Sequence, residues 1–201
     1  MFILRYFLEE AEPISDSFDF LMVLYSIIVG IGMGQILMAV GQILQAEKVI
    51  RVYWIHTAWV LLILLSHILM WFGAWEYRAI ETWNFYQFLS FLMVPALLYI
   101  ASVIAFPDMS QERDFDLRDY YYTRYGWLHA LLALVIALLS INEFIMLDHS
   151  VFVLQNAIKG LALLVLLIGF LSRQPKVHAT QIVIIYGLLA FFAWDFRGIA
   201  G

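Results

Sequence analysis

Residues 18–44 read FDFLMVLYSIIVGIGMGQILMAVGQIL, a run of 27 residues in which Asp19 is the only charged side chain. A helix needs about 20 apolar residues to cross the hydrocarbon core of a bilayer, so this run is long enough to span it. Five further stretches have the same character and, with the first, fill most of the 201-residue chain. The expected spans are residues 18–44, 52–75, 83–106, 121–146, 151–171 and 177–196.

The composition agrees with membrane insertion. Hydrophobic residues make up 64% of the chain and charged residues 13%, whereas soluble domains are about 45–50% apolar and about 25% charged. A transmembrane β-barrel would show alternating strands of about 10 residues, but these runs are continuous and roughly twice as long. The sequence therefore predicts an all-α polytopic membrane helical bundle with six transmembrane helices, forming a single transmembrane domain over residues 1–201.

Basic residues between the spans are unevenly distributed. Seven lie in or beside the loops that follow the first, third and fifth spans: Lys48, Arg51, Arg113, Arg118, Arg124, Arg173 and Lys176. Only three, Arg5, Arg78 and Arg197, lie on the other side. Loops rich in Lys and Arg stay in the cytoplasm, so the loops after the first, third and fifth spans are expected to be cytoplasmic. Both termini are then expected to be periplasmic. A short apolar run at the N-terminus is followed by acidic residues, so the first span is expected to act as an uncleaved signal-anchor.

A short motif recurs where even-numbered spans begin. Arg51–His56 and Arg124–His129 both follow the pattern R-x-x-W-x-H, and the sixth span begins with Lys176-Val-His178. Since a basic residue followed by a histidine recurs at the start of every even-numbered span, the pattern suggests three repeated helical hairpins. Internal repeats are common in transporters. The alternative is a coincidence of residue preferences at the membrane surface.

Lys159 is the strongest pointer to a functional site, because it lies inside the fifth span. A charged side chain at the bilayer centre costs at least about 2.5–3.5 kcal/mol on insertion scales, so Lys159 is expected to face the bundle interior and find a partner. Candidate partners are Glu143, Asn142, Asp195 and Asp19. The outer half of the bundle is expected to hold a polar vestibule, above an apolar constriction, that forms a ligand or ion pathway. Its predicted residues are Lys159, His67, Glu143, Gln155, Asn156 and Asp195. A purely structural ion pair is the alternative.

Three residues are expected to govern helix packing. Gly30 and Gly34 form a GxxxG stripe, which lets helices approach closely in lipid. Pro95 lies near the middle of the third span, where it removes a backbone hydrogen bond and bends the helix. The glycine stripe also predicts a homo-oligomer. At the start of the fourth span, Asp116 or Asp119 is expected to cap the helix.

Several chemistries have no basis in the sequence. The chain contains no cysteine, which excludes disulfides, iron–sulfur clusters and thiolate metal sites. No nucleophile–base pair or metal-ligand constellation is evident, so no catalytic residue, metal site or cofactor is expected. The net charge of −5 gives no basic patch for nucleic acid. The expected partners are membrane lipids, a further copy of the chain and a small solute or ion.

Several stretches resemble those of a group of small multi-span proteins of proteobacterial inner membranes whose activity is not known. They are RVYWIH (51–56), SHILMW (66–71), WNFYQFL (83–89), DLRDYY (116–121) and SRQPKVH (172–178). The resemblance covers most of the chain. It implies a location in a bacterial inner membrane and no particular activity.

Three classes of function fit these observations. A channel or transporter for an ion or small solute is favoured by Lys159, the polar outer half, the glycine-rich first span and Pro95. A non-catalytic sensor, scaffold or accessory subunit fits the small size and the lack of motifs. A membrane haem or quinone redox protein fits less well, because His67 has no second histidine at matching depth.

Overall fold

Six long helices account for most of the chain that the structure, a computed structural model, describes: residues 16–108, 114–147 and 154–195. The fold is an all-α helical bundle, as predicted. A 3₁₀ helix, η1 (Ala74–Ala79), extends the second long helix, and β1 (Ile50–Arg51) and β2 (Phe115–Asp116) are two-residue strands. The long helices are α2 (Asp16–Gln45), α3 (Trp54–Gly73), α4 (Phe85–Ile104), α5 (Leu117–Met146), α6 (Leu154–Leu171) and α7 (Pro175–Asp195).

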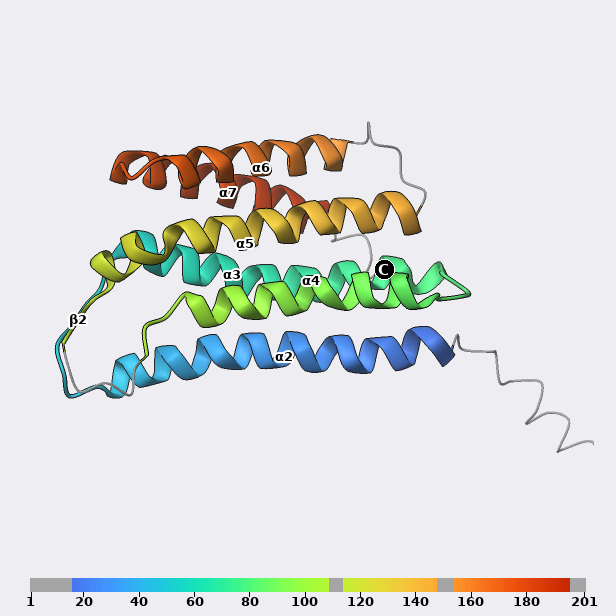
Figure 1. The fold of residues 1–201 in the computed structure, drawn as a ribbon, viewed down its shortest axis with the longest axis horizontal. Helices are drawn as coiled ribbons and strands as arrows, with labels where there is room; N and C mark the ends of the chain where they lie inside the picture. Colours follow the sequence, from blue (N-terminus) through green and yellow to red (C-terminus); the bar gives the residue numbers. More distant parts are fainter. Residues whose placement is uncertain (1–15, 109–113, 148–153, 196–201) are drawn as a thin grey trace, which may run out of the picture.

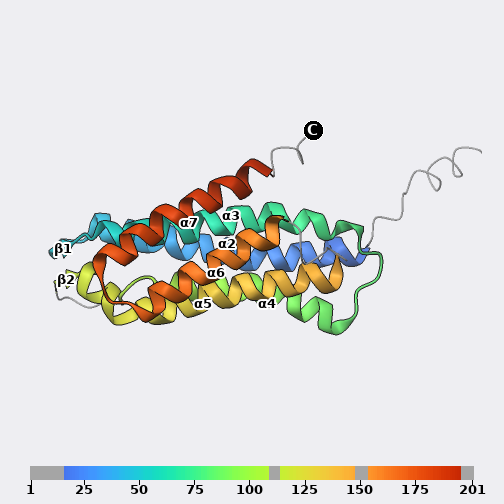
Figure 2. The same cartoon turned by 90° about the horizontal axis from the view of Figure 1, so that it is seen from above.

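Successive helices run in opposite directions, so the bundle has two ends (Figure 1). We call the end where α2, α4 and α6 finish the inner end, and the other the outer end. Neighbouring helices follow the order α2, α4, α5, α6, α7 and α3, and α3 also packs on α2, which closes a ring. Figure 2 shows α3 and α7 on one side of the bundle and α4 and α5 on the other. Helix α3 further contacts α4 and α5 across this ring. The space between these helices is where the candidate site lies.

Side-chain caps fix the starts of α5 and α4. The carboxylate of Asp116 accepts hydrogen bonds from the backbone N–H groups of Arg118 (2.8 Å) and Asp119 (3.4 Å). This confirms Asp116 as the cap and lets α5 begin at Leu117, four residues before the predicted span. Helix α4 begins with a reciprocal capping box between Asn84 and Gln87.

The outer end of α3 is longer than predicted. The regular helix ends at Gly73, and the backbone tightens into η1 as far as Ala79. A 3₁₀ turn commonly extends a helix end, because its i→i+3 bonds satisfy terminal carbonyl groups. The predicted start of the fifth span, residues 151–153, lies outside the described residues.

Two loops are joined at the inner end. Strand β1 pairs in parallel with β2, and the Val49 N–H also donates to the carboxylate of Asp114 at 3.1 Å. The ammonium of Lys48 lies 5.0 Å from the centre of the Phe115 ring. These contacts connect the α2–α3 loop to residues just before α5.

Apolar side chains cover the outside of the bundle as well as its core. Phe85 and Val183 are 71% and 72% exposed, whereas Ile63 and Leu98 are fully buried. Within the described residues, five helices are long and apolar enough to cross a membrane, and α7 contributes a shorter apolar stretch over Pro175–Phe191. An apolar exterior of this extent is stable in lipid rather than in water. The chain is therefore a multi-pass membrane protein.

The glycines of α2 lie on two faces of the helix that have different surroundings. A Cβ atom on Gly32 would lie 2.1 Å from Nε2 of His67, so α2 and α3 approach each other at this point. A Cβ atom on Gly30 or Gly34 would meet nothing within 4 Å. The predicted packing glycines therefore make no close contact with the rest of the described chain, and Gly32 makes it instead. Pro95 is buried within an α4 that continues past it to Ile104.

Each predicted hairpin is a pair of packed neighbours: α2 with α3, α4 with α5 and α6 with α7. In the recurring motif, Trp54 and Trp127 are exposed, while His56 and His129 are buried. Their placement fits the residue preferences of a membrane surface as well as duplication. Descent from a repeated hairpin stays a prediction.

Candidate functional site

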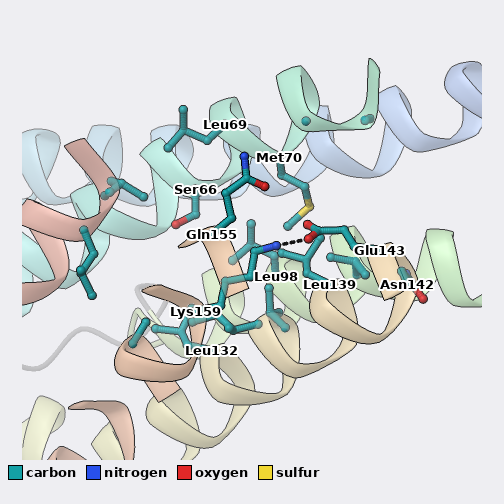
Figure 3. A pocket seen from close by; sticks show the side chains of 18 of the residues that line it. Ser66, Leu69, Met70, Leu98, Leu132, Leu139, Asn142, Glu143, Gln155 and Lys159 are labelled. Carbon is teal, nitrogen blue, oxygen red and sulfur yellow. Dashed lines mark hydrogen bonds and ion pairs between the residues drawn. The ribbon is translucent and has the colours of Figure 1, made fainter. Parts of the chain in front are cut away.

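An ion pair joins α5 to α6 inside the outer half of the bundle. The Lys159 ammonium pairs with the carboxylate of Glu143, which lies in the last turn of α5 (Figure 3). The two side chains are only 10% and 14% exposed. A charge in this environment is tolerated when a partner of opposite sign neutralises it. The structure thus pairs Lys159 with one of the partners expected from the sequence.

A cavity of about 210 Å³ begins at this ion pair. All six helices and η1 contribute to its wall. At the outer end the wall includes Lys159, Glu143, Gln155 and Ser66 (Figure 3). An apolar cavity of about 150 Å³ already holds a benzene-sized molecule, so this volume suits a small organic ligand.

The rest of the wall is apolar or aromatic. Its residues include Tyr25, Trp59, Leu62, Leu69, Phe91, Val94, Leu98, Leu132, Val135, Leu139, Ala162, Leu166 and Ile185. The expected polar vestibule above an apolar constriction stays a prediction, and the polar side chains named above line the outer end of this cavity. The space is mainly apolar, because α3, α4, α5 and α7 turn their leucine, valine and isoleucine faces inward.

Tyr77 of η1 adds a polar group to the cavity wall. It is 4% exposed, and its hydroxyl has no hydrogen-bond partner among the residues that the structure describes. A buried hydroxyl without a partner costs about 1–3 kcal/mol. A ligand in the cavity could offset this cost by accepting or donating a hydrogen bond. Sequence reasoning missed Tyr77, because it stands in the short connection after the second span, where aromatic residues are ordinary membrane anchors.

The structure separates the other predicted site residues. Gln155 lines the cavity, whereas the half-buried Asn156 does not. His67 is fully buried, but it lies in the contact with Gly32 of α2 rather than in the cavity wall, and its Nδ1 donates to the Ile63 carbonyl at 2.9 Å. The side chain of Asp195 lies outside the described residues.

Asn142 acts between helices. Its amide nitrogen donates to the Ser90 carbonyl at 3.2 Å, and its oxygen accepts from the Ser90 hydroxyl at 2.5 Å. These two bonds fasten α5 to α4 one residue before Glu143. Asn142 therefore positions the helix end that carries the carboxylate.

A second polar group lies towards the inner end, and we call it the inner cluster. It consists of Trp59, Tyr121, His129, His178 and Gln181. Trp59 belongs to the cavity wall, and its ring centre lies 4.8 Å from that of His129. His129 in turn lies 5.4 Å from His178. The inner cluster thus continues from the cavity towards the inner end.

Gln181 reaches the inner cluster through a close approach of α6 and α7. A Cβ atom on Gly169 would lie 2.2 Å from the Gln181 amide. With no side chain there, the amide nitrogen donates to the Val165 carbonyl at 2.8 Å, and its oxygen lies 3.0 Å from Nε2 of His129. Apart from the recurring histidines, no pattern described in the sequence analysis predicts this cluster.

Among the described residues, no three histidine or acidic side chains lie together in a way that could hold a metal ion. No family model, curated protein or solved structure matches the chain. The inner-membrane location implied by the quoted motifs therefore stays a prediction. What the site can do must be argued from its own geometry.

Removing one member of the ion pair should cost more than removing both. Lys159→Met strands the Glu143 carboxylate, and losing one partner of a buried pair costs about 3–5 kcal/mol. We expect a lower unfolding midpoint in detergent for Lys159→Met and substantial recovery when Glu143→Gln is added. The control is Lys176→Met, since Lys176 is exposed at the inner end. A single variant as stable as wild type would show that the pair does not stabilise the bundle.

Proposed function

We propose that the protein is a carrier for a small amphipathic solute and that the cavity is its binding site. The observation behind this proposal is the buried Lys159–Glu143 pair in the wall of a largely apolar cavity to which all six helices contribute. Binding sites of membrane carriers lie inside the bundle, between helices that can move against each other. The inner cluster lies between the cavity and the inner end, an arrangement that favours a carrier over a permanently open channel.

The charges of the site favour a zwitterion with an apolar body. Lys159 and Glu143 carry opposite charges, so the pair as a whole is neutral. A zwitterion can bring a carboxylate to Lys159 and an ammonium group to Glu143, which leaves no charge unpaired. A solute with one charge would leave either Lys159 or Glu143 without a partner, which is costly in an apolar site. The apolar wall would hold the remainder of the molecule.

The solute can be identified by stabilisation of the purified protein. We expect apolar zwitterions such as leucine to raise the unfolding midpoint more than the matching amine, acid or uncharged amide. Stabilisation grows with ligand concentration when only the folded state binds. Uptake of the stabilising compound into liposomes would then test transport.

Two matched variants test whether the stabilising solute binds in the cavity. Ala162 lines the cavity and is 8% exposed, whereas the neighbouring Leu161 is 45% exposed on the outside. Ala162→Phe should fill the space and abolish both stabilisation and uptake, while Leu161→Phe should leave both unchanged. A folded Ala162→Phe protein that still binds and transports the solute would contradict the proposal.

We propose that the inner end faces the cytoplasm of a bacterial inner membrane and that both termini are periplasmic. Six of the basic residues counted above lie at or near the inner end, and Arg78 lies at the outer end. Positive charge near span ends is retained in the cytoplasm.

Cysteine labelling tests this orientation, because the chain contains no cysteine. Thr82 and Glu47 are exposed, in the α3–α4 connection at the outer end and just after α2 at the inner end. A membrane-impermeant maleimide should label Thr82→Cys in intact cells and Glu47→Cys only after lysis. The reverse pattern would invert the orientation.

We also propose that copies of the chain associate through α2. The observation is the open space beside Gly30 and Gly34, next to the exposed apolar side chains of Ile27 and Ile31. Close packing against small residues drives helix association in lipid. This face would equally serve the second candidate function, an accessory subunit that binds another membrane protein.

Replacing both glycines tests the association. The double variant Gly30→Leu, Gly34→Leu should lower the mass of the particle in detergent without lowering stability, because neither position is close to another part of the described chain. Gly32→Ala is the matched control. It should lower stability by about 1–3 kcal/mol, since overpacking must displace His67. A monomeric wild type would remove the case for a homo-oligomer.

A further inference from the structure

The inner cluster contains one histidine whose two ring nitrogens both face hydrogen-bond acceptors. In His129, Nδ1 lies 2.7 Å from the carbonyl oxygen of Tyr125, and Nε2 lies 3.0 Å from Oε1 of Gln181. A neutral imidazole has one N–H group and therefore satisfies only one of these acceptors. An imidazolium has two N–H groups and satisfies both.

The orientation of Gln181 is fixed by a second contact. Its amide nitrogen lies 2.8 Å from the carbonyl oxygen of Val165, which can only accept a hydrogen bond. Turning the amide over would place two oxygens against each other at that distance. The amide oxygen therefore stays towards His129, and the need for two donors on the imidazole remains.

The surroundings of His129 contain features that oppose a positive charge and features that support one. It is 1% exposed, and burial in apolar surroundings disfavours the charged form. The two hydrogen-bond acceptors, the Tyr125 carbonyl and the Gln181 amide oxygen, favour it. No carboxylate of the described residues contacts it, so the charge is not locked in a salt bridge and the proton can leave.

The titratable groups around His129 are few. Helix α7 contributes His178, and α5 contributes Tyr125 and, beyond it, Tyr121. Helix α3 contributes Trp59 and α6 the Val165 carbonyl, neither of which titrates. A change in protonation between about pH 5 and 8 at this place would therefore belong to His129 or His178.

His178 lies between His129 and the inner end. Its Nε2 donates to the carbonyl of Ser172, in the short turn between α6 and α7, at 2.9 Å, and its Nδ1 accepts from the Tyr121 hydroxyl at 2.8 Å. One N–H group satisfies these contacts, so a neutral His178 suffices. His178 thus lies next to the inner turn on one side and next to His129 on the other.

We infer that His129 is a proton-binding site inside the bundle, occupied as an imidazolium held by Tyr125 and Gln181 and reached from the inner end past His178. Trp59 contacts both His129 and the cavity, so the floor of the cavity responds to this proton. If the chain is the carrier proposed above, proton binding at His129 is coupled to solute movement, and that coupling rests on the proposed function. The proton site itself does not.

Nitrogen NMR of the full chain in lipid tests the site directly. With ¹⁵N-labelled histidine, an imidazolium shows two protonated ring nitrogens and a neutral ring shows one. In a titration from about pH 8 down to about pH 5, we expect one histidine to become doubly protonated while the others keep a single ring proton. Gln181→Leu removes one acceptor and should shift the midpoint of that histidine down by about 1 pH unit, a tenfold loss of proton affinity.

Fluorescence gives a second readout. A protonated imidazole quenches the fluorescence of an adjacent indole, so the emission of Trp59 should fall on acidification. Because the chain has seven tryptophans, the Trp59 emission is obtained as the difference between wild type and Trp59→Phe. His129→Gln should abolish the fall. His56→Gln is the matched control. His56 is also buried, but among the described residues only one of its ring nitrogens, Nε2, makes a hydrogen bond, donating to the Ala105 carbonyl at 2.7 Å.

The outcomes are decisive in either direction. The inference is overturned if no histidine of the folded wild-type protein is doubly protonated across this pH range, or if the titrating histidine does not respond to Gln181→Leu. Should His129→Gln fail to fold, the wild-type and Gln181→Leu spectra still decide. Loss of transport with an intact proton titration would refute the carrier and leave the proton site standing.

Discussion

A charge inside a membrane-embedded bundle must be neutralised, and the pairing of Lys159 with Glu143 meets this requirement. The pair fixes how the outer ends of α5 and α6 face each other. The Asn142–Ser90 hydrogen bonds fasten α5 to α4 at the same level, so three neighbouring helices are connected around the outer part of the cavity. In lipid, where apolar packing has no hydrophobic driving force between helices, such polar contacts gain importance.

The interior divides into two chemically distinct levels. The outer level holds the ion pair, the Tyr77 hydroxyl and the largely apolar cavity, which is the combination behind the proposal of a zwitterionic solute with an apolar body. The inner level holds histidines, tyrosines and Gln181, which form hydrogen bonds with one another and with backbone carbonyls. Trp59 touches both levels, so a change of charge at one can alter the shape of the other.

Two glycines determine where the polar side chains fit. Gly32 makes room for the imidazole of His67 between α2 and α3, and Gly169 makes room for the amide of Gln181 between α6 and α7. In both places a single methyl group would occupy the position of the polar side chain. The same residue type at Gly30 and Gly34 meets open space, so an identical sequence signal has different structural consequences on two faces of one helix.

The sequence by itself determined the fold class and the approximate spans, and it narrowed the cap of α5 to Asp116 or Asp119, because these features depend on apolar run length and on local hydrogen bonding. It also singled out Lys159, since one charge within an apolar run is visible without coordinates. Only the tertiary structure decided that Glu143 is its partner, that His67 faces α2, that Tyr77 joins the cavity and that His129 meets Gln181. Each of these depends on which helices are neighbours and how each is rotated about its axis. When a helix is apolar on every side, its sequence does not show which face packs against the other helices, because lipid and the protein interior favour the same side chains.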